Sequence, residues 1–129
     1  HERFPAPCSP SEGHFRNATP APSAGIWRTR MNKVLVIGGD GFCGWPTSLY
    51  LSEQGYDVTI VDNLSRRKID NRLGVVSLTP IKSTQERIEA WKEVSGKTIK
   101  FVELDVAQEF DDLAILMGEL RPDAVVHFG

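Results

Sequence analysis

The sequence has few cysteines, no long apolar run and no large excess of charge of either sign. Its two cysteines, Cys8 and Cys43, suggest neither a disulfide framework nor a metal site, and they favour a reducing compartment. No apolar run reaches the roughly 18 residues that a membrane-spanning helix needs. The formal net charge of −2 gives no strong attraction to nucleic acid or to an anionic membrane. These absences predict a soluble protein that holds no metal and binds neither nucleic acid nor membrane.

What is present is the composition of one small globular domain that follows a tail of different character. The chain has 129 residues, of which 40% are hydrophobic and 25% are charged. Residues 1–31 hold five of the eight prolines and show no apolar periodicity, so we expect a disordered tail there. A transit-peptide-like segment, a native linker, or translated sequence upstream of a start at Met31 all fit this tail. Because the chain begins at His1 and stops at Gly129 directly after a strand-like run, we interpret it as a fragment.

A glycine-rich stretch after the first apolar run carries the main functional signal. The run Val34–Ile37 ends in glycines at positions 38, 41 and 44, and a helix-like segment follows. In a dinucleotide-binding turn, the first glycine permits a sharp bend and the second lets the backbone approach a pyrophosphate. The third lets the helix pack closely against the strand. The N–H groups at the start of that helix would face the phosphates.

An acid at the end of the second strand strengthens this interpretation. The apolar run Asp57–Val61 is followed by Asp62, roughly 20 residues past the glycines. An aspartate at this position should accept hydrogen bonds from an adenosine ribose and repel a 2′-phosphate, so NAD is favoured over NADP. The alternative is an ordinary strand–helix–strand turn with a surface aspartate, in which case no nucleotide binds.

The rest of the pattern predicts an α/β domain over residues 32–129. Strands are expected at Lys33–Ile37, Asp57–Val61, Thr98–Leu104 and Ala124–Phe128, and helices at Phe42–Gln54, Thr84–Val94 and Phe110–Leu120. Pro46 should cause a kink or a late start in the first helix. Ser83 and Glu86 form a predicted capping box. Right-handed crossovers place the third, second, first and fourth strands side by side, which is the N-terminal half of a Rossmann-like doubly wound parallel sheet.

Ligands bind at the carboxyl ends of the strands in such a sheet, so we expect the glycine turn, Asp62, Asp105 and His127 to lie near one another. The predicted cofactor-binding residues are Gly38, Gly41, Phe42, Cys43, Gly44, Asp62, Asn63, Arg66, Asp105, Val106, Phe128 and Gly129. A basic run at residues 66–72 lies in an expected loop, Leu64–Lys82. It is either a solvated surface or a contact with a phosphate.

Several conspicuous side chains are given structural roles. Asp40 is expected to cap the first helix or to bond its own loop, because a carboxylate is unfavourable beside a pyrophosphate. His127 is expected to shape the turn after the fourth strand, although a role as a base stays open. Trp45 and Trp91 are assigned to packing. Cys43, at a helix N-terminus, is assigned to packing ahead of reactivity.

The sequence resembles the extended short-chain dehydrogenase/reductase family, which includes nucleotide-sugar epimerases and dehydratases. The segments that carry the resemblance are Gly38–Gly44, Val61–Leu64 and Val125–Gly129. Others indicate the branch that makes the sulfolipid head group, namely Asp40, Trp45, Arg66-Arg67, residues 77–81, Arg87, Trp91-Lys92 and Gly96-Lys97. This resemblance covers residues 32–129. Pro46 departs from the helix former expected at its position.

The resemblance implies a longer enzyme that holds NAD and converts UDP-glucose and sulfite into a sulfonated sugar nucleotide, with a homodimer expected. Its catalytic Tyr-x-x-x-Lys pair and threonine would lie beyond Gly129, so no catalytic residue is assigned here and the fragment alone should be inactive. The chloroplast stroma is expected in a photosynthetic eukaryote, and the cytoplasm otherwise. Another nucleotide-sugar epimerase or dehydratase, or a non-catalytic NAD-binding module, remains an alternative.

Overall fold

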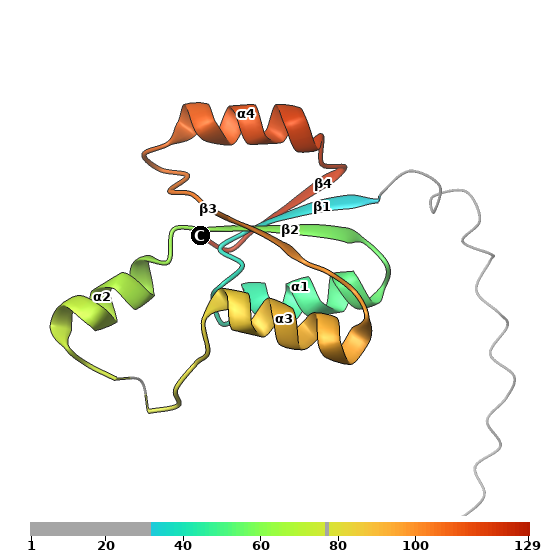
Figure 1. The fold of residues 1–129 in the computed structure, drawn as a ribbon. Coiled ribbons are helices and arrows are strands. Elements are labelled where there is room, and N and C mark those ends of the chain that lie inside the picture. The colour runs from blue at the N-terminus through green and yellow to red at the C-terminus, as the bar shows by residue number, and fades with distance from the viewer. Residues whose placement is uncertain (1–31, 77) are drawn as a thin grey trace, which may run out of the picture.

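The computed structural model describes residues 32–76 and 78–129. The expected disordered tail, residues 1–31, lies outside these described residues. The described part forms one parallel sheet with helices on both faces (Figure 1).

The sheet has the predicted strand order, β3-β2-β1-β4. Its strands are β1 (Lys33–Ile37), β2 (Asp57–Asp62), β3 (Lys100–Glu103) and β4 (Ala124–His127). All three pairings are parallel, and in the register Val36 of β1 lies between Ile60 of β2 and Val126 of β4. The carboxyl ends of the four strands therefore meet at one edge of the sheet, as a ligand-binding Rossmann half requires.

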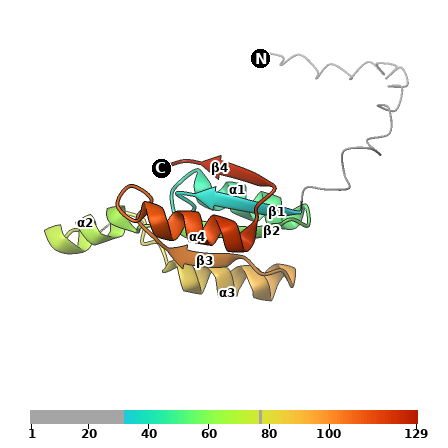
Figure 2. The ribbon, with the colours of Figure 1, turned by 90° about the horizontal axis from the view of Figure 1, so that it is seen from above.

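Helices cover the two faces of the sheet unequally. On one face α1 (Gly44–Glu53) and α3 (Thr84–Ser95) lie side by side, and on the other lies α4 (Phe110–Leu120), as Figures 1 and 2 show. The central strands are buried from both sides, which explains their continuous apolar sequence. The core beneath α1 and α3 is built on Val34, Val36, Val58, Ile60, Ile88 and Ile99. The core beneath α4 is built on Leu35, Ile37, Val61 and Leu104.

The first helix begins at Gly44, two residues later than the expected Phe42, and so confirms the late start. Pro46 then falls in the first turn, where a missing backbone N–H removes no intrahelical hydrogen bond. The buried face of the helix consists of Gly44, Ser48 and Ser52. These small side chains, spaced by four residues, let the helix axis approach the sheet closely.

The third helix matches its sequence signals. Ser83 accepts a hydrogen bond from the Glu86 backbone N–H, and the Glu86 carboxylate accepts one from the Ser83 backbone in return, which confirms the capping box. Ile88 is buried in the core and Trp91 packs against it. Gly96 ends the helix in the left-handed conformation, with φ of 71°.

The expectation of a loop over Leu64–Lys82 is wrong for its first half. Residues Ser65–Leu73 form a helix, α2, that extends away from the sheet (Figure 1). None of its residues is buried, so it has no apolar stripe from which periodicity could have predicted it. Its N-cap, Leu64, has a left-handed backbone with φ of 54°.

Candidate functional site

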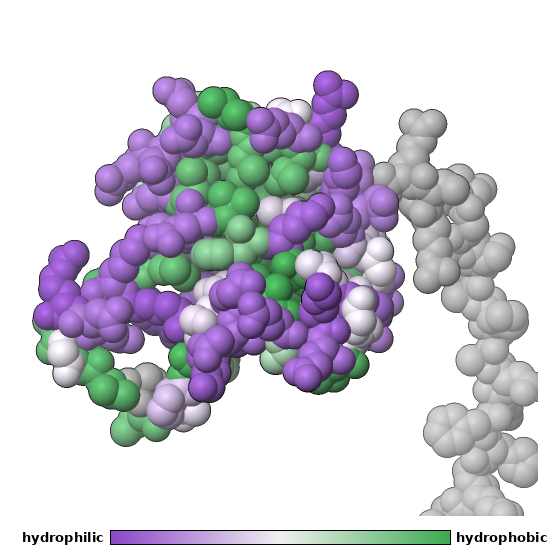
Figure 3. Space-filling model, in the orientation of Figure 1, coloured by the Kyte–Doolittle hydropathy of each residue, from purple (hydrophilic) through white to green (hydrophobic). Residues whose placement is uncertain are grey.

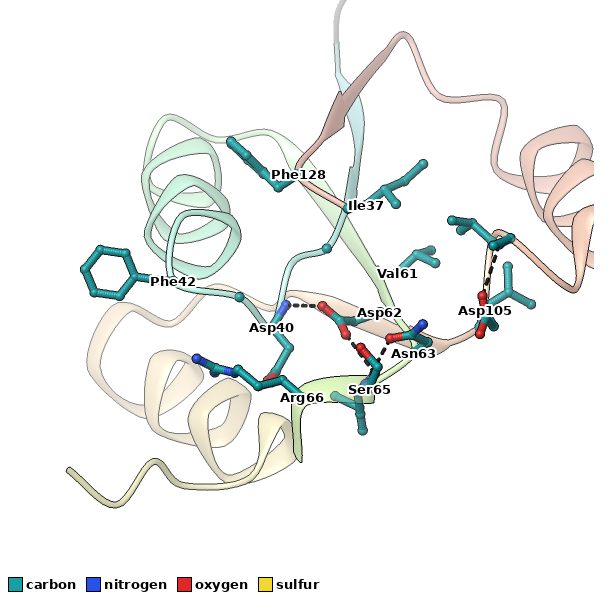
Figure 4. A pocket seen from close by; sticks show the side chains of 17 residues that line it. Ile37, Asp40, Phe42, Val61, Asp62, Asn63, Ser65, Arg66, Asp105 and Phe128 are labelled. Carbon is teal, nitrogen blue, oxygen red and sulfur yellow. Dashed lines mark hydrogen bonds between the residues drawn. The ribbon is translucent and has the colours of Figure 1, made fainter. Parts of the chain in front are cut away.

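A cleft of about 420 Å³ opens at the carboxyl ends of the strands. It lies between the glycine turn after β1, the start of α2, the turn after β3 and the end of β4 (Figure 4). The structure brings together here all the predicted cofactor-binding residues except two: Gly38, Gly41, Phe42, Asp62, Asn63, Arg66, Asp105, Val106, Phe128 and Gly129. The two that do not line the cleft are Cys43 and Gly44.

The glycines of the turn serve different needs. Gly38 has a left-handed backbone (φ of 76°) and donates its N–H to the Val61 carbonyl at 2.8 Å. A Cβ on Gly44 would overlap the Gly38 carbonyl oxygen, so this glycine seats the helix against the turn from beneath the cleft. A Cβ on Gly41 would meet only that same carbonyl oxygen, at 3.2 Å. Gly41 therefore leaves open space on the cleft side, which suits the close approach of a pyrophosphate.

Gly39 is a functional glycine that the three-residue spacing missed. A Cβ at this position would overlap the side chain of Ile60 on the neighbouring strand. Gly39 therefore lets the turn lie flat over β2. Its adjacency to Gly38 was the only signal for it in the sequence.

The start of α1 is suited to an anion. Cys43 is the N-cap and its side chain makes no capping hydrogen bond, and the first turn contains no acidic residue. The Trp45 N–H donates to the Gly41 carbonyl at 3.1 Å and Pro46 has no N–H, so the Gly44 N–H and the positive end of the helix dipole are what the first turn offers to a phosphate. Cys43 itself is exposed. Its thiol neither lines the cleft nor fills the core, so the packing role expected for it is wrong.

Asp62 faces the cleft with a fixed orientation. Its Oδ2 accepts from the Asp40 backbone N–H at 2.9 Å, and its Oδ1 accepts from the Leu64 backbone N–H at 2.8 Å. Both bonds are drawn in Figure 4. Each carboxylate oxygen retains further acceptor capacity, so a ribose diol can donate to an acid that is already positioned.

The wall across from the glycine turn comes from the ends of β2 and β3. The Asn63 side chain accepts from the Ser65 backbone N–H at 2.9 Å, and the Asp105 side chain accepts from the Ala107 backbone N–H at 3.1 Å. Both side chains thus hold their own turns, and Val106 adds an apolar surface to the cleft. Such a wall fits a flat apolar ring with polar edges.

The Asp40 side chain neither caps α1 nor bonds its own loop, so both roles expected for it are wrong. Its carboxylate is buried and accepts hydrogen bonds from Arg67, Thr84 and Arg87. Burial raises the pKa of Asp40, but the hydrogen bonds from Arg67 and Thr84 and the two arginine charges outweigh burial and leave that pKa below its usual value. Arg87 also stacks on the Trp45 ring, with 4.3 Å between its guanidinium carbon and the ring centroid.

The basic run divides into different contacts. Arg66 lines the cleft, and in Figure 4 its side chain extends past Asp40 toward the side where Phe42 lies. Arg67 turns away to Asp40, and Lys68 pairs with Glu103 on the surface at 2.6 Å. The run is therefore neither a uniform solvated surface nor a uniform phosphate contact.

His127 has the structural role predicted for it. Its Nδ1 accepts a hydrogen bond from the Gly129 backbone N–H at 3.2 Å, which holds the turn after β4. The structure also adds cleft residues that had not been predicted to bind the cofactor, namely Ile37, Asp40, Val61, Leu64, Ser65, Leu104 and Ala107. Each is a sequence neighbour of a predicted residue, and this adjacency was the available signal.

Within residues 32–76 and 78–129, no cluster of three or more histidine, cysteine or acidic side chains is placed to hold a metal ion. In the same part of the chain, none of the helices combines the length and apolar character needed to cross a bilayer.

Curated relatives share most of the folded part. The chain is 54% identical over 97 residues to the chloroplastic UDP-sulfoquinovose synthase of Spinacia oleracea. It is 35% identical over 96 residues to the UDP-sulfoquinovose synthase of Sulfolobus acidocaldarius. These matches cover 75% and 74% of this chain but only 20% and 24% of the relatives. The chain therefore spans about a fifth to a quarter of their length.

Solved structures with the same fold carry a dinucleotide. One is UDP-glucose 4-epimerase from Bifidobacterium longum in complex with NAD⁺ and UDP, with a TM-score of 0.56 and 30% identity over 76% of this chain and 24% of that one. Another is UDP-glucose-4-epimerase from Stenotrophomonas maltophila with bound NAD and formylated UDP-arabinopyranose. Its TM-score is 0.55 and its identity 32%, over 77% of this chain and 24% of that one. The model of the NAD dependent epimerase/dehydratase family matches residues 34–129, and the chain belongs to this family.

Proposed function

We propose that this chain binds NAD as the cofactor-binding part of a longer enzyme that modifies a UDP-sugar. The observation that carries the proposal is the convergence at one cleft of the open Gly41 backbone and the fixed acid Asp62, with the start of α1 directly after the glycine turn. Gly41 and the helix start would hold the pyrophosphate, and Asp62 the adenosine ribose. Asp105 and Val106 would enclose the adenine. When bound, NAD would supply reversible hydride transfer.

Within the family, the proposed reaction is the formation of UDP-sulfoquinovose from UDP-glucose and sulfite. It is supported by the 54% identity to the spinach synthase, which exceeds the roughly 30% identity to the epimerase structures. The residues described here contribute binding and orientation of the cofactor. The groups that move protons on the sugar are expected beyond Gly129.

Cofactor binding is tested by calorimetric titration of NAD into the full-length protein that contains this chain. Asp62→Ala should weaken NAD binding by about tenfold or more, the effect of losing a charged hydrogen bond. Asp57→Ala is a matched control, because Asp57 stands at the opposite end of the same strand and pairs with Lys100 on the surface. Equal NAD affinity in both variants would remove Asp62 from the site.

A 4-epimerase reaction is the second candidate, favoured by the two epimerase structures that share this fold. The purified full-length protein should convert UDP-glucose only when sulfite is present. Formation of UDP-galactose without sulfite would establish the epimerase instead.

A further inference from the structure

A buried carboxylate lies next to the acid assigned to the ribose. Asp40 is 5% exposed, and its side chain accepts from Arg67 Nε at 2.7 Å and from Thr84 Oγ1 at 2.6 Å. It also accepts from Arg87. Its backbone N–H donates to Asp62 Oδ2 at 2.9 Å. A single hydrogen bond thus joins Asp62, at the end of β2, to Asp40, in the turn after β1.

Arginine near such an acid is the usual means by which this fold accommodates a 2′-phosphate. The start of α2 offers Arg66 and Arg67 side by side, but only Arg66 lines the cleft. The Arg67 guanidinium makes four hydrogen bonds to other groups, two of them to Asp40. Besides Asp40, it donates to the carbonyl of Lys82 at 2.9 Å and to the carbonyl of Ile81 at 3.4 Å.

We propose that Asp40 determines cofactor selectivity by holding the Arg67 guanidinium group away from the ribose end of the cleft, which favours NAD over NADP. This inference rests on the NAD binding proposed above. Asp62 repels a 2′-phosphate directly, whereas Asp40 withholds the cation that would otherwise attract one. Two acids with different contacts thus act on the same group of the cofactor.

Loss of the Asp40 charge should release Arg67 rather than Arg87. Arg87 is stacked on Trp45 and its side chain is 16% exposed, so packing holds it in place. Arg67 is 23% exposed and makes its other contacts with carbonyls at the surface. With a neutral residue at position 40, the two guanidinium groups repel each other, and Arg67 is the one free to move toward an anion in the cleft.

The test measures the dissociation constants of NAD and NADP for the full-length protein by calorimetry. Asp40→Asn should shift the NADP-to-NAD affinity ratio toward NADP by about tenfold or more, the effect of one charged hydrogen bond. Adding Arg67→Gln to Asp40→Asn should return the ratio to the wild-type value. Glu53→Gln is the matched control, because it removes an equal charge and frees Lys97 at the C-terminal end of α1, opposite to the end that meets the glycine turn. Its ratio should not change.

The outcomes separate this inference from the proposed function. Wild-type protein that binds neither dinucleotide overturns both. Wild-type protein that prefers NAD, with an unchanged ratio in Asp40→Asn, overturns the selectivity role alone. If Asp40→Asn does not fold, as judged by its thermal melt, Arg67→Gln in the native background decides. It should leave the ratio unchanged, and weaker NADP binding there would show that Arg67 already faces the phosphate.

Discussion

At the scale of single residues, the ion pairs of Asp40 explain how an acid can directly precede Gly41, the glycine proposed to face the pyrophosphate. A free carboxylate there would repel a pyrophosphate, since like charges at short range are unfavourable. The Asp40 carboxylate instead pairs with two arginines and a threonine. Its backbone N–H donates to Asp62, which lines the cleft. These side-chain contacts join the glycine turn to α2 and α3. Among the described residues, no backbone hydrogen bond makes that connection.

This network predicts an acid-sensitive contribution to stability. Because the pKa of Asp40 is lowered in the folded state, its stabilisation is fully present above the ordinary aspartate pKa of about 3.9 and is lost as pH falls through the lowered value. Asp40→Asn should therefore lower the free energy of unfolding by about 3 kcal/mol at neutral pH, as expected when one partner of a buried ion pair is removed. The difference from wild type should shrink below about pH 4. Urea unfolding of both proteins between pH 3 and 7 measures this, and a constant difference would contradict it.

The glycine turn gives a second prediction at this scale. Gly41→Val should abolish NAD binding while the circular dichroism spectrum is retained, because the branched side chain fills the space left for the pyrophosphate. Gly118→Val is the control, since a Cβ at Gly118, on α4, meets no atom within 4 Å. Retained NAD affinity in Gly41→Val would show that the cofactor does not approach this backbone.

At the scale of elements, α1 shows how side-chain volume sets the position of a helix. Its buried face is made of small residues, and the larger Leu49 and Leu51 pack at its flanks. Ser48 is fully buried and donates to the Gly44 carbonyl, and the Ser52 hydroxyl accepts from the Trp91 indole at 3.0 Å. A close helix keeps its N-terminus against the glycine turn, so packing far from the cleft fixes the end of α1 that we propose binds the pyrophosphate.

Enlarging this face should therefore affect both stability and binding. Ser48→Leu should lower the free energy of unfolding by about 1–3 kcal/mol, because added volume in a packed contact displaces the helix. It should also weaken NAD binding. Tyr50→Leu, at a 64% exposed position of the same helix, should change neither. Thermal melts and NAD titrations of the two variants provide the comparison, and equal behaviour would show that the helix does not need its small face.

At the scale of the whole molecule, the sheet ends in an apolar edge strand. Val125 of β4 is 44% exposed, and Phe128, the residue that follows the end of this strand, is 45% exposed. Apolar surface also appears in Figure 3 between α4 and the sheet, and at the lower left over the segment that follows α2. In that segment Val76 is 83% exposed, and Leu78 lies fully exposed. An open parallel edge with apolar neighbours is a template for pairing with another chain.

We therefore expect residues 31–129 expressed alone to be marginally stable and to self-associate, because a complete domain has only about 5–15 kcal/mol of net stability. They should also bind NAD weakly. Val125→Lys should raise the monomer fraction in sedimentation velocity by placing a charge at the edge. Val94→Lys, on the exposed side of α3, is the control. A wild-type monomer with a cooperative melt and tight NAD binding would contradict this prediction.

Local sequence determined the elements and their order. Continuous apolar runs fixed the strands, Ser83 and Gly96 fixed the ends of α3, and Leu113 and Leu116 fixed the inward face of α4. The three-residue glycine spacing and the acid at the end of β2 were enough to place the cleft. These signals are local, since each depends on residues within a few positions along the chain.

Only the tertiary structure decided which partners the polar side chains take. Asp40 meets Arg67 and Arg87, which follow it by 27 and 47 positions, and no periodicity encodes such a pairing. The helix α2 likewise has no buried face to leave a pattern in the sequence. The sequence by itself determined where the cleft lies, because strand ends and glycine turns are local. The folded chain decided which charges surround that site, because only folding brings residues from three helices and two strand ends together.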